Sequence, residues 1–160
     1  MYALPFLLSL VFTWSLAFAQ APSLTLHVSA PSFRLGDRLR TVLELSNPLP
    51  SPVTVDMYVG IVTPTGTVYW IKDVNTFEGS WSNSLNDDPR TFLSLWPGMT
   101  LIPGLRETWT EFVEYTFAGP EPVGTYHILV AWTMPGSFAD GRIDPGDVIA
   151  GDWKAFNFTP

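Results

Sequence analysis

The sequence predicts an all-β protein, an antiparallel sandwich of about seven or eight strands in one domain. Apolar side chains recur at every second position in successive short segments, which is the period of a half-buried strand. The 160 residues include 11 Phe, 7 Trp and 5 Tyr, which favour pleated sheets, and 15 Pro and 12 Gly, which favour tight turns. No segment shows a helical period. Two stacked sheets bury such alternating faces against each other.

The first two strands are predicted over 23–30 and 38–45. In both, apolar side chains alternate with polar ones, and those expected to face the core are Leu24, Leu26, Val28, Ala30, Leu39, Thr41, Leu43 and Leu45. Residues 31–37 between them are expected to form a turn. The proline-rich segment 47–52 must be a connection, because proline cannot donate a ladder hydrogen bond.

The clearest hairpin is predicted over 53–72. The chain alternates strictly from 53 to 61, where the expected inward side chains are Val53, Val55, Met57, Val59 and Ile61. Pro64-Thr65-Gly66 is a tight-turn sequence, so Gly66 is a predicted structural residue. The turn should fold the first strand back onto residues 67–72.

The second half of the chain is predicted to hold a long loop and four strands. Residues 73–100 are rich in Ser, Asn, Asp and Gly and indicate a loop, with a short strand over 91–95. Longer strands are expected over 106–117, 126–133 and 148–158. In the first of these, the inward side chains should be Val113, Tyr115 and Phe117.

The N-terminal segment is predicted to be a signal peptide. Residues 1–19 are largely apolar and end in the small-x-small sequence Ala17-Phe18-Ala19, so cleavage would leave residues 20–160 as the folded domain. Since no Lys or Arg precedes the apolar run, an uncleaved anchor stays an alternative. No later segment could span a membrane. We therefore expect an extracytoplasmic protein, either periplasmic, cell-surface or secreted.

Charge and cysteine content exclude several classes of function. The formal net charge of -7 argues against nucleic acid and acidic membranes as partners. The absence of cysteine excludes thiol catalysis, thiolate zinc sites and lipid attachment through an N-terminal cysteine. Small exported animal domains usually carry disulfides, so a bacterial origin is favoured.

Three segments carry a family resemblance. Residues 55–70 form the predicted hairpin, Pro122-Val123-Gly124-Thr125-Tyr126 leads into an apolar strand, and Phe33-Arg34-Leu35-Gly36-Asp37 precedes the second strand. Together they resemble Ig-like or fibronectin type III-like modules of bacterial exported proteins. The resemblance implies an Ig-like sandwich without shared catalytic residues. It also implies that Gly124 lies in a turn and that the Tyr126 hydroxyl bonds to upstream backbone as a tyrosine corner.

The acidic segment 139–147 is a candidate calcium site. Asp140, Asp144 and Asp147 are separated by turn residues, and hard Ca²⁺ prefers such oxygen ligands. The spacing does not match an EF-hand loop. A solvated acidic turn is the alternative, so no cofactor is required and Ca²⁺ is the one candidate.

A ligand-binding end is predicted from the two long connections. In an Ig-like sandwich, loops such as 73–100 and 134–147 emerge at the same end. The candidate ligand-binding residues there are Trp81, Asp87, Asp88 and Trp96. Aromatic faces beside polar groups suit a protein or glycan partner. The alternative is that these aromatic rings fold back and cap the sandwich.

Catalysis finds little support. His27 and His127 lie in strand patterns, and Glu111 and Glu114 lie on a strand where carboxylates are usually solubilising. The sequence lacks a nucleophile elbow, a zinc-protease helix motif and a glycine-rich phosphate loop. We therefore predict that the chain is not an enzyme.

The function expected from the sequence is an exported, non-catalytic binding or structural module of a bacterial envelope or secretome. A calcium-stabilised carbohydrate-binding module is one alternative. An envelope assembly subunit that offers a strand edge to a partner is another. The sequence leaves the oligomeric state open.

Overall fold

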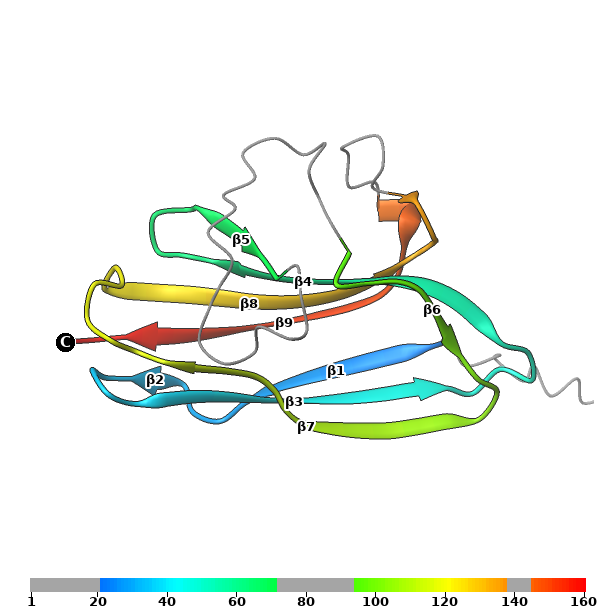
Figure 1. Ribbon diagram of the computed structural model, residues 1–160, viewed down its shortest axis with the longest axis horizontal. Helices are drawn as coiled ribbons and strands as arrows, with labels where there is room; N and C mark the ends of the chain where they lie inside the picture. Colours follow the sequence, from blue (N-terminus) through cyan, green and yellow to red (C-terminus); the bar gives the residue numbers. More distant parts are fainter. Residues whose placement is uncertain (1–20, 72–93, 138–144) are drawn as a thin grey trace, which may run out of the picture.

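The computed structural model describes residues 21–71, 94–137 and 145–160, which form a sandwich of two β-sheets (Figure 1). This confirms the predicted all-β architecture. The predicted signal peptide lies outside the described residues. So do several candidate binding residues, namely Trp81, Asp87, Asp88, Asp140 and Asp144.

The smaller sheet has three antiparallel strands in the order β1-β3-β7, namely β1 (Ser23–Val28), β3 (Arg38–Asn47) and β7 (Leu105–Thr116). Burial alternates along β1 and β3 with the predicted period. The side chains that it places in the core include Leu24, Leu26, Leu39, Leu43 and Leu45.

The larger sheet has the order β2-β9-β8-β4-β5, and β6 pairs with the same edge of β4 as β5 does. Its strands are β2 (Ser32–Phe33), β4 (Val53–Val62), β5 (Val68–Trp70), β6 (Trp96–Leu101), β8 (Gly124–Thr133) and β9 (Val148–Phe158). A short 3-10 helix, η4 (Pro145–Asp147), leads into β9. The β4–β5 hairpin and the long strands β8 and β9 lie where the sequence predicted them.

Two short strands lie outside the predicted pattern. β2 falls within the expected turn 31–37 and pairs in parallel with β9, so the large sheet is not purely antiparallel. β6 covers the end of the expected loop 73–100, and the strand predicted over 91–95 is not seen among its described residues, 94 and 95. β6 contains Pro97 and Gly98, which are typical of turns, and for this reason the sequence did not predict a strand here.

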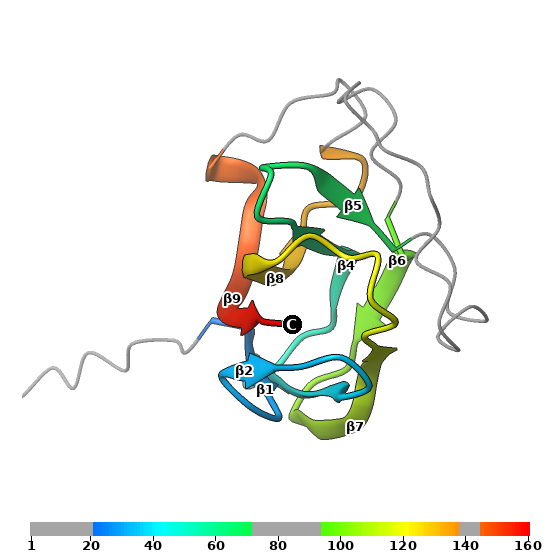
Figure 2. The same ribbon diagram turned by 90° about the vertical axis from the view of Figure 1, so that its left-hand side faces the viewer.

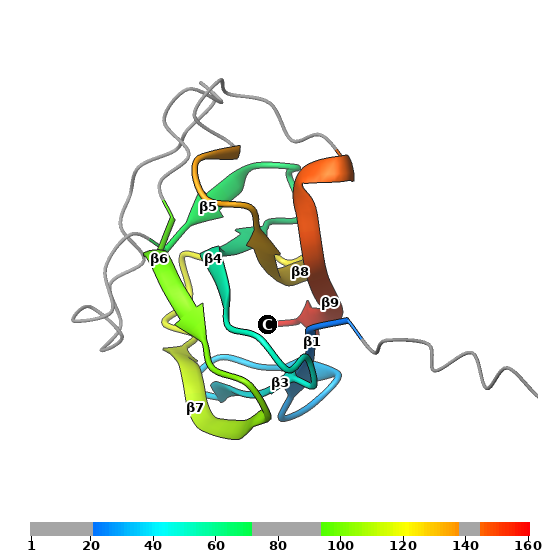
Figure 3. The same cartoon turned by 90° about the vertical axis from the view of Figure 1, so that its right-hand side faces the viewer.

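The core fills the space between the sheets and is most aromatic at one end. Phe117 stacks on Phe158 with ring centroids 4.5 Å apart, and Tyr126 stacks on Phe156 at 5.5 Å. Phe33 of β2 packs against Phe117 at 5.5 Å. Figure 2 views this end, where the chain crosses from β7 to β8. Figure 3 views the opposite end, where the β3–β4 and β6–β7 connections cross.

One side of the sandwich is closed by side chains. β1 and β9 belong to different sheets but lie next to each other (Figure 1). The Leu26 amide of β1 donates to Asp152 Oδ2 of β9 at 2.8 Å, and Lys154 Nζ donates to the same oxygen at 2.8 Å. At this contact between β1 and β9, called here the β1–β9 seam, the Asp152 carboxylate accepts a hydrogen bond that a backbone carbonyl would accept within a sheet.

Candidate functional site

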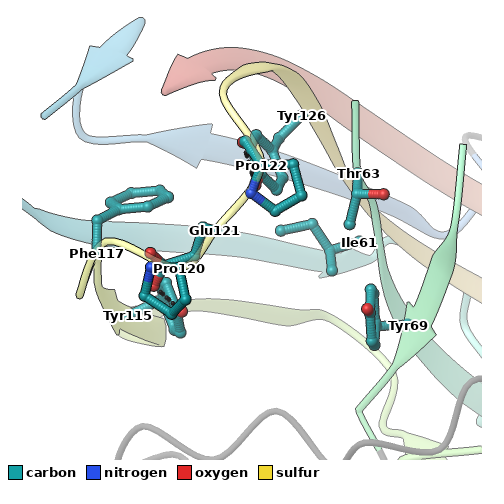
Figure 4. A pocket seen from close by; sticks show the side chains of 9 residues that line it. All are labelled: Ile61, Thr63, Tyr69, Tyr115, Phe117, Pro120, Glu121, Pro122 and Tyr126. Carbon is teal, nitrogen blue, oxygen red and sulfur yellow. Dashed lines mark hydrogen bonds between the residues drawn. The ribbon is translucent and has the colours of Figure 1, made fainter. Parts of the chain in front are cut away.

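A pocket of about 300 Å³ opens where the chain crosses from the small sheet to the large one (Figure 4). Its walls come from β4 and the turn after it, from β5, from the end of β7, from the β7–β8 connection and from the start of β8. The lining residues are Ile61, Thr63, Tyr69, Tyr115, Phe117, Pro120, Glu121, Pro122 and Tyr126.

Two glycines allow the surrounding turns to form. Gly66 (φ 81°) closes the β4–β5 turn, where its amide donates to the Thr63 carbonyl oxygen at 2.9 Å. Gly124 (φ 137°) begins β8, and a Cβ at this position would lie 2.9 Å from the Pro64 Cβ. Only glycine accepts both this conformation and so close an approach. The β7–β8 connection can therefore lie directly against the β4–β5 turn.

Tyr126 holds the β7–β8 connection in place. Its ring is buried in the core, and its hydroxyl donates to the Pro122 carbonyl oxygen at 2.6 Å. This is the type of bond that a tyrosine corner makes. It holds the backbone at the mouth of the pocket in one position.

Glu121 is the charged group of the pocket. Its Oε1 accepts hydrogen bonds from the Tyr115 hydroxyl and from the Ala118 amide at 2.9 Å, and its Oε2 accepts one from the Gly119 amide at 2.6 Å. Burial by itself would raise the pKa of Glu121, but these hydrogen bonds together hold that pKa below its ordinary value. The carboxylate is therefore ionised at neutral pH.

The pKa values of two lining tyrosines, Tyr126 and Tyr115, are raised by burial and also by Glu121. Burial raises the pKa of Tyr126 to about 12, with further contributions from the charge of Glu121 and from Tyr69. Burial and the hydrogen bond to Glu121 likewise raise the pKa of Tyr115. Both phenols stay neutral at physiological pH, so the described lining of the pocket carries one negative charge, that of Glu121, among polar hydroxyls.

The structure describes two of the predicted loop and metal residues. Trp96 lies half-buried in β6, with its ring centroid 5.2 Å from that of Trp109 and 6.3 Å from that of Phe112. Asp147 lies in η4, where its carbonyl oxygen accepts from the Met134 amide at 3.0 Å. Within the described ranges, no three carboxylate or imidazole groups are placed to share a metal ion.

The remaining polar residues singled out from the sequence make contacts on the surface. His27 lies 3.5 Å from Glu44, and Arg40 lies 3.7 Å from Glu111 and 3.2 Å from Glu114. These contacts link neighbouring strands of the small sheet. None of these side chains lines the pocket.

An exposed aromatic ring lies on the outer face of the large sheet. Trp153 of β9 is 60% exposed, and its ring centroid lies 5.3 Å from that of His127. Gly151 and Ala155, which precede and follow it on the same side of β9, have small side chains or none. The sequence interpretation missed Trp153 because it concentrated on aromatic residues in loops.

No protein-family model matches the sequence, and no curated protein is significantly similar to it. Among solved structures, the chain is similar to the Pseudomonas fluorescens alkylpurine DNA glycosylase AlkC bound to DNA containing an abasic site analog, with 14% identity, a TM-score of 0.49 and 88% of this chain covered. It is also similar to the Bacillus subtilis sporulation control protein Spo0M, with 8% identity, a TM-score of 0.46 and 88% of this chain covered.

A Niemann-Pick type C2 protein from the Japanese carpenter ant has 8% identity and a TM-score of 0.44, and the match covers 89% of this chain and 96% of that one. By contrast, the chain spans 31% of the glycosylase and 50% of Spo0M. At these identities and TM-scores, the likenesses assign neither a family nor a function.

In the part of the chain that the structure describes, no helix is long and apolar enough to cross a bilayer.

Proposed function

We propose that the chain is an exported, non-catalytic binding module of a bacterial envelope or secretome, and that its ligand site is the pocket at the β7–β8 crossing. The observation that carries the proposal is the composition of this pocket. Aromatic and proline side chains form its walls, and a few polar groups converge on it from distant parts of the chain. Small-molecule sites in proteins commonly combine these features.

The chemistry of the lining favours binding over catalysis. Acid–base hydrolysis of the glycosidase type uses two carboxyl groups, whereas the described residues of the pocket lining offer one, that of Glu121. Both oxygens of that carboxylate already accept hydrogen bonds from the protein. Its lowered pKa also makes it a weak general base at neutral pH.

Export is supported by the sequence of residues 1–19. Expression of the full chain in a bacterium, followed by N-terminal sequencing of the extracytoplasmic product, tests this part of the proposal. The expected first residue is Gln20. A product that keeps residues 1–19 and stays in the membrane would indicate an anchor.

Ligand binding is tested by nuclear magnetic resonance on the purified product. A mixed library of small cations, anions, sugars and neutral aromatics is screened for compounds that shift the signals of Tyr69, Glu121 and Tyr126. At least one compound should shift these signals together and saturably. If none does, the proposed site is wrong.

The exposed Trp153 supports a second candidate, a carbohydrate-binding module. A flat, solvent-facing indole is suited to stacking against the apolar face of a sugar ring. Binding to a glycan array that is lost in Trp153→Ala, while Tyr69→Leu still binds, would favour this candidate. Thermal melting with and without EDTA tests whether Ca²⁺ stabilises the module.

The edge of the small sheet bears on the third candidate, an assembly subunit. β7 is the outer strand of that sheet and has a bulge, where Glu111 takes a positive φ of 55° and the register shifts between Arg40 and Val42. Glutamates and bulges at an edge discourage pairing with another strand. The geometry of β7 therefore disfavours the addition of a partner strand at this edge.

A further inference from the structure

We propose that the pocket binds a small organic cation of the alkylammonium class, held between the tyrosine rings and the carboxylate of Glu121. This inference rests on the proposed function, since it names the ligand of the same pocket. The argument uses the charge of Glu121, the character of the walls and the size of the space.

Glu121 carries a negative charge that no described residue neutralises. Its donors include the Tyr115 hydroxyl and the backbone amides of Ala118 and Gly119, and its own backbone amide also contributes to the lowered pKa; all of these groups are neutral. Among the described residues that line the pocket there is no Lys, Arg or His. A half-buried carboxylate is most stable beside a positive charge, so a cationic ligand would supply what the pocket lacks.

The hydrogen bonds of Glu121 leave room for a ligand contact. An ionised carboxylate has about four acceptor positions. Oε1 uses two for Tyr115 and Ala118, and Oε2 uses one for Gly119. The amide of Glu121 itself also contributes to the lowered pKa of the carboxylate, so the ligand contact need not be a hydrogen bond. A methylated ammonium group could lie beside Oε2 without one.

The walls of the pocket suit a cation as well. Tyr69 lies on one side of the space, and Tyr115, Pro120 and Glu121 lie on the other (Figure 4). The faces of aromatic rings carry partial negative charge and attract ammonium groups, most strongly where water is excluded. The rings of Tyr69 on β5 and Tyr115 on β7 therefore add to the field of the carboxylate.

The volume of the pocket and the negative charge of Glu121 restrict the ligand further. A volume of about 300 Å³ lies at the small end of the range for ligand sites, so the cation should be a small molecule. An anion would be repelled by Glu121. A neutral molecule could fill the space but would leave the carboxylate uncompensated.

The decisive experiment compares choline with its neutral isostere 3,3-dimethylbutan-1-ol, which has the same shape without the charge. Each is titrated into the purified product and followed by the signals of Tyr69, Glu121 and Tyr126. Choline should bind at least tenfold more tightly than the isostere. Equal binding, or no binding of choline, would overturn the inference.

Two matched pairs of variants locate the contact. Tyr69→Leu should weaken choline binding about tenfold by removing one aromatic wall, whereas Tyr69→Phe keeps the ring and should bind as the parent does. Glu121→Gln removes the charge and should abolish the preference for choline over the isostere. Glu44 is an exposed carboxylate outside the pocket, so Glu44→Gln should leave the preference for choline unchanged.

The outcomes separate this inference from the proposed function. If choline fails but a neutral or anionic compound of the library shifts the pocket signals, the binding site stands and the cationic ligand is wrong. If Tyr69→Leu binds choline as well as the parent does, the cation lies elsewhere. Circular dichroism of each variant shows whether a loss of binding reflects unfolding.

Discussion

The carboxylate of Asp56 on β4 connects two separate turns to the large sheet. Its Oδ1 accepts a hydrogen bond from the Gly98 amide at 2.7 Å, and its Oδ2 accepts one from the Gly136 amide at 2.8 Å. The residue is only 6% exposed. Hydrogen bonds to a charged acceptor stabilise a fold more than neutral ones do. Asp56 thus fixes both β6 and the start of the segment after β8.

Replacement of Asp56 by Ala should lower the free energy of unfolding by about 2–4 kcal/mol, because both amides lose their acceptor in a partly buried place. Urea denaturation of the purified product measures this change. The control is Glu44→Gln, an exposed carboxylate, which should change stability by less than about 0.5 kcal/mol. An Asp56→Ala variant as stable as this control would show that water replaces the carboxylate at no cost.

The same strand shows what residue-level patterns can predict. Alternation along 53–61 correctly assigns Val55, Met57 and Val59 to the core. It also places Asp56 and Tyr58 on the opposite face, yet the structure buries them too. Period-two alternation reports which side a residue faces. It cannot report that a second layer of contacts, such as that of Tyr58 with Trp70, buries the outer side as well.

At the scale of elements, the two turns beside the pocket differ in how tightly they are packed. Gly66 and Gly124 both have a positive φ, but a Cβ at Gly66 would meet no atom within 4 Å. At Gly124 it would lie 2.9 Å from Pro64. The first position requires only an unusual conformation. The second also requires the absence of a side chain.

Substitution of each glycine by alanine should separate these two effects. Gly66→Ala should cost about 1 kcal/mol of stability from backbone strain, and Gly124→Ala should cost about 2–4 kcal/mol because steric overlap is added. Thermal melting of the two variants beside the parent measures the difference. Equal losses would mean that the β7–β8 connection shifts freely away from the β4–β5 turn.

The elements themselves were predictable where an alternation or a turn sequence marks them. Strands of ten or more residues, such as β3, β4 and β9, repeat the alternation often enough to be read from the sequence. β2 has two residues, and β6 contains Pro97 and Gly98, so neither displays a period. Both are strands only because β9 and β4 offer free backbone groups beside them. Such pairing depends on the tertiary structure.

At the scale of the whole molecule, two carboxylates stabilise places where the sheets meet: Asp152 links β1 to β9, and Glu121 holds the connection that crosses from β7 to β8. Burial would raise the pKa of Asp152, but the hydrogen bonds from Lys154, Leu26 and Trp153 hold it below the ordinary value of 3.8. The pKa of Glu121 is also lowered. A lowered pKa in the folded state means that the stabilisation is complete above the ordinary value and is lost as pH falls through the folded one.

The molecule should therefore lose stability below about pH 4, as these two carboxylates become protonated. Asp152→Asn should lower the free energy of unfolding by about 1–3 kcal/mol at pH 7, because the contact with Lys154 loses its charge. Its deficit relative to the parent should shrink toward pH 3. Urea denaturation at a series of pH values measures both effects. A deficit that stays constant with pH would show that Asp152 acts through shape alone.

The candidate pocket was less predictable than the fold. The resemblance to Ig-like modules pointed to Gly124 and Tyr126, because it rests partly on the segment Pro122-Val123-Gly124-Thr125-Tyr126 and the apolar strand that follows it. Glu121 and Tyr69 carry no such signal, since they are separated in sequence and meet only when the two sheets stack. The sequence instead directed attention to the connections after β5 and β8, whereas the described pocket lies at the opposite end of β8.

The position of the pocket has a consequence for assays. Its walls belong to both sheets, with Tyr115 from one and Tyr69 from the other. A bound compound would be released whenever the layers separate, so occupancy must raise the melting temperature. Saturation at a hundred times the dissociation constant corresponds to about 2.7 kcal/mol of added stability. A thermal-shift survey of metabolite extracts could thus report on occupants of unknown structure before any of them is purified.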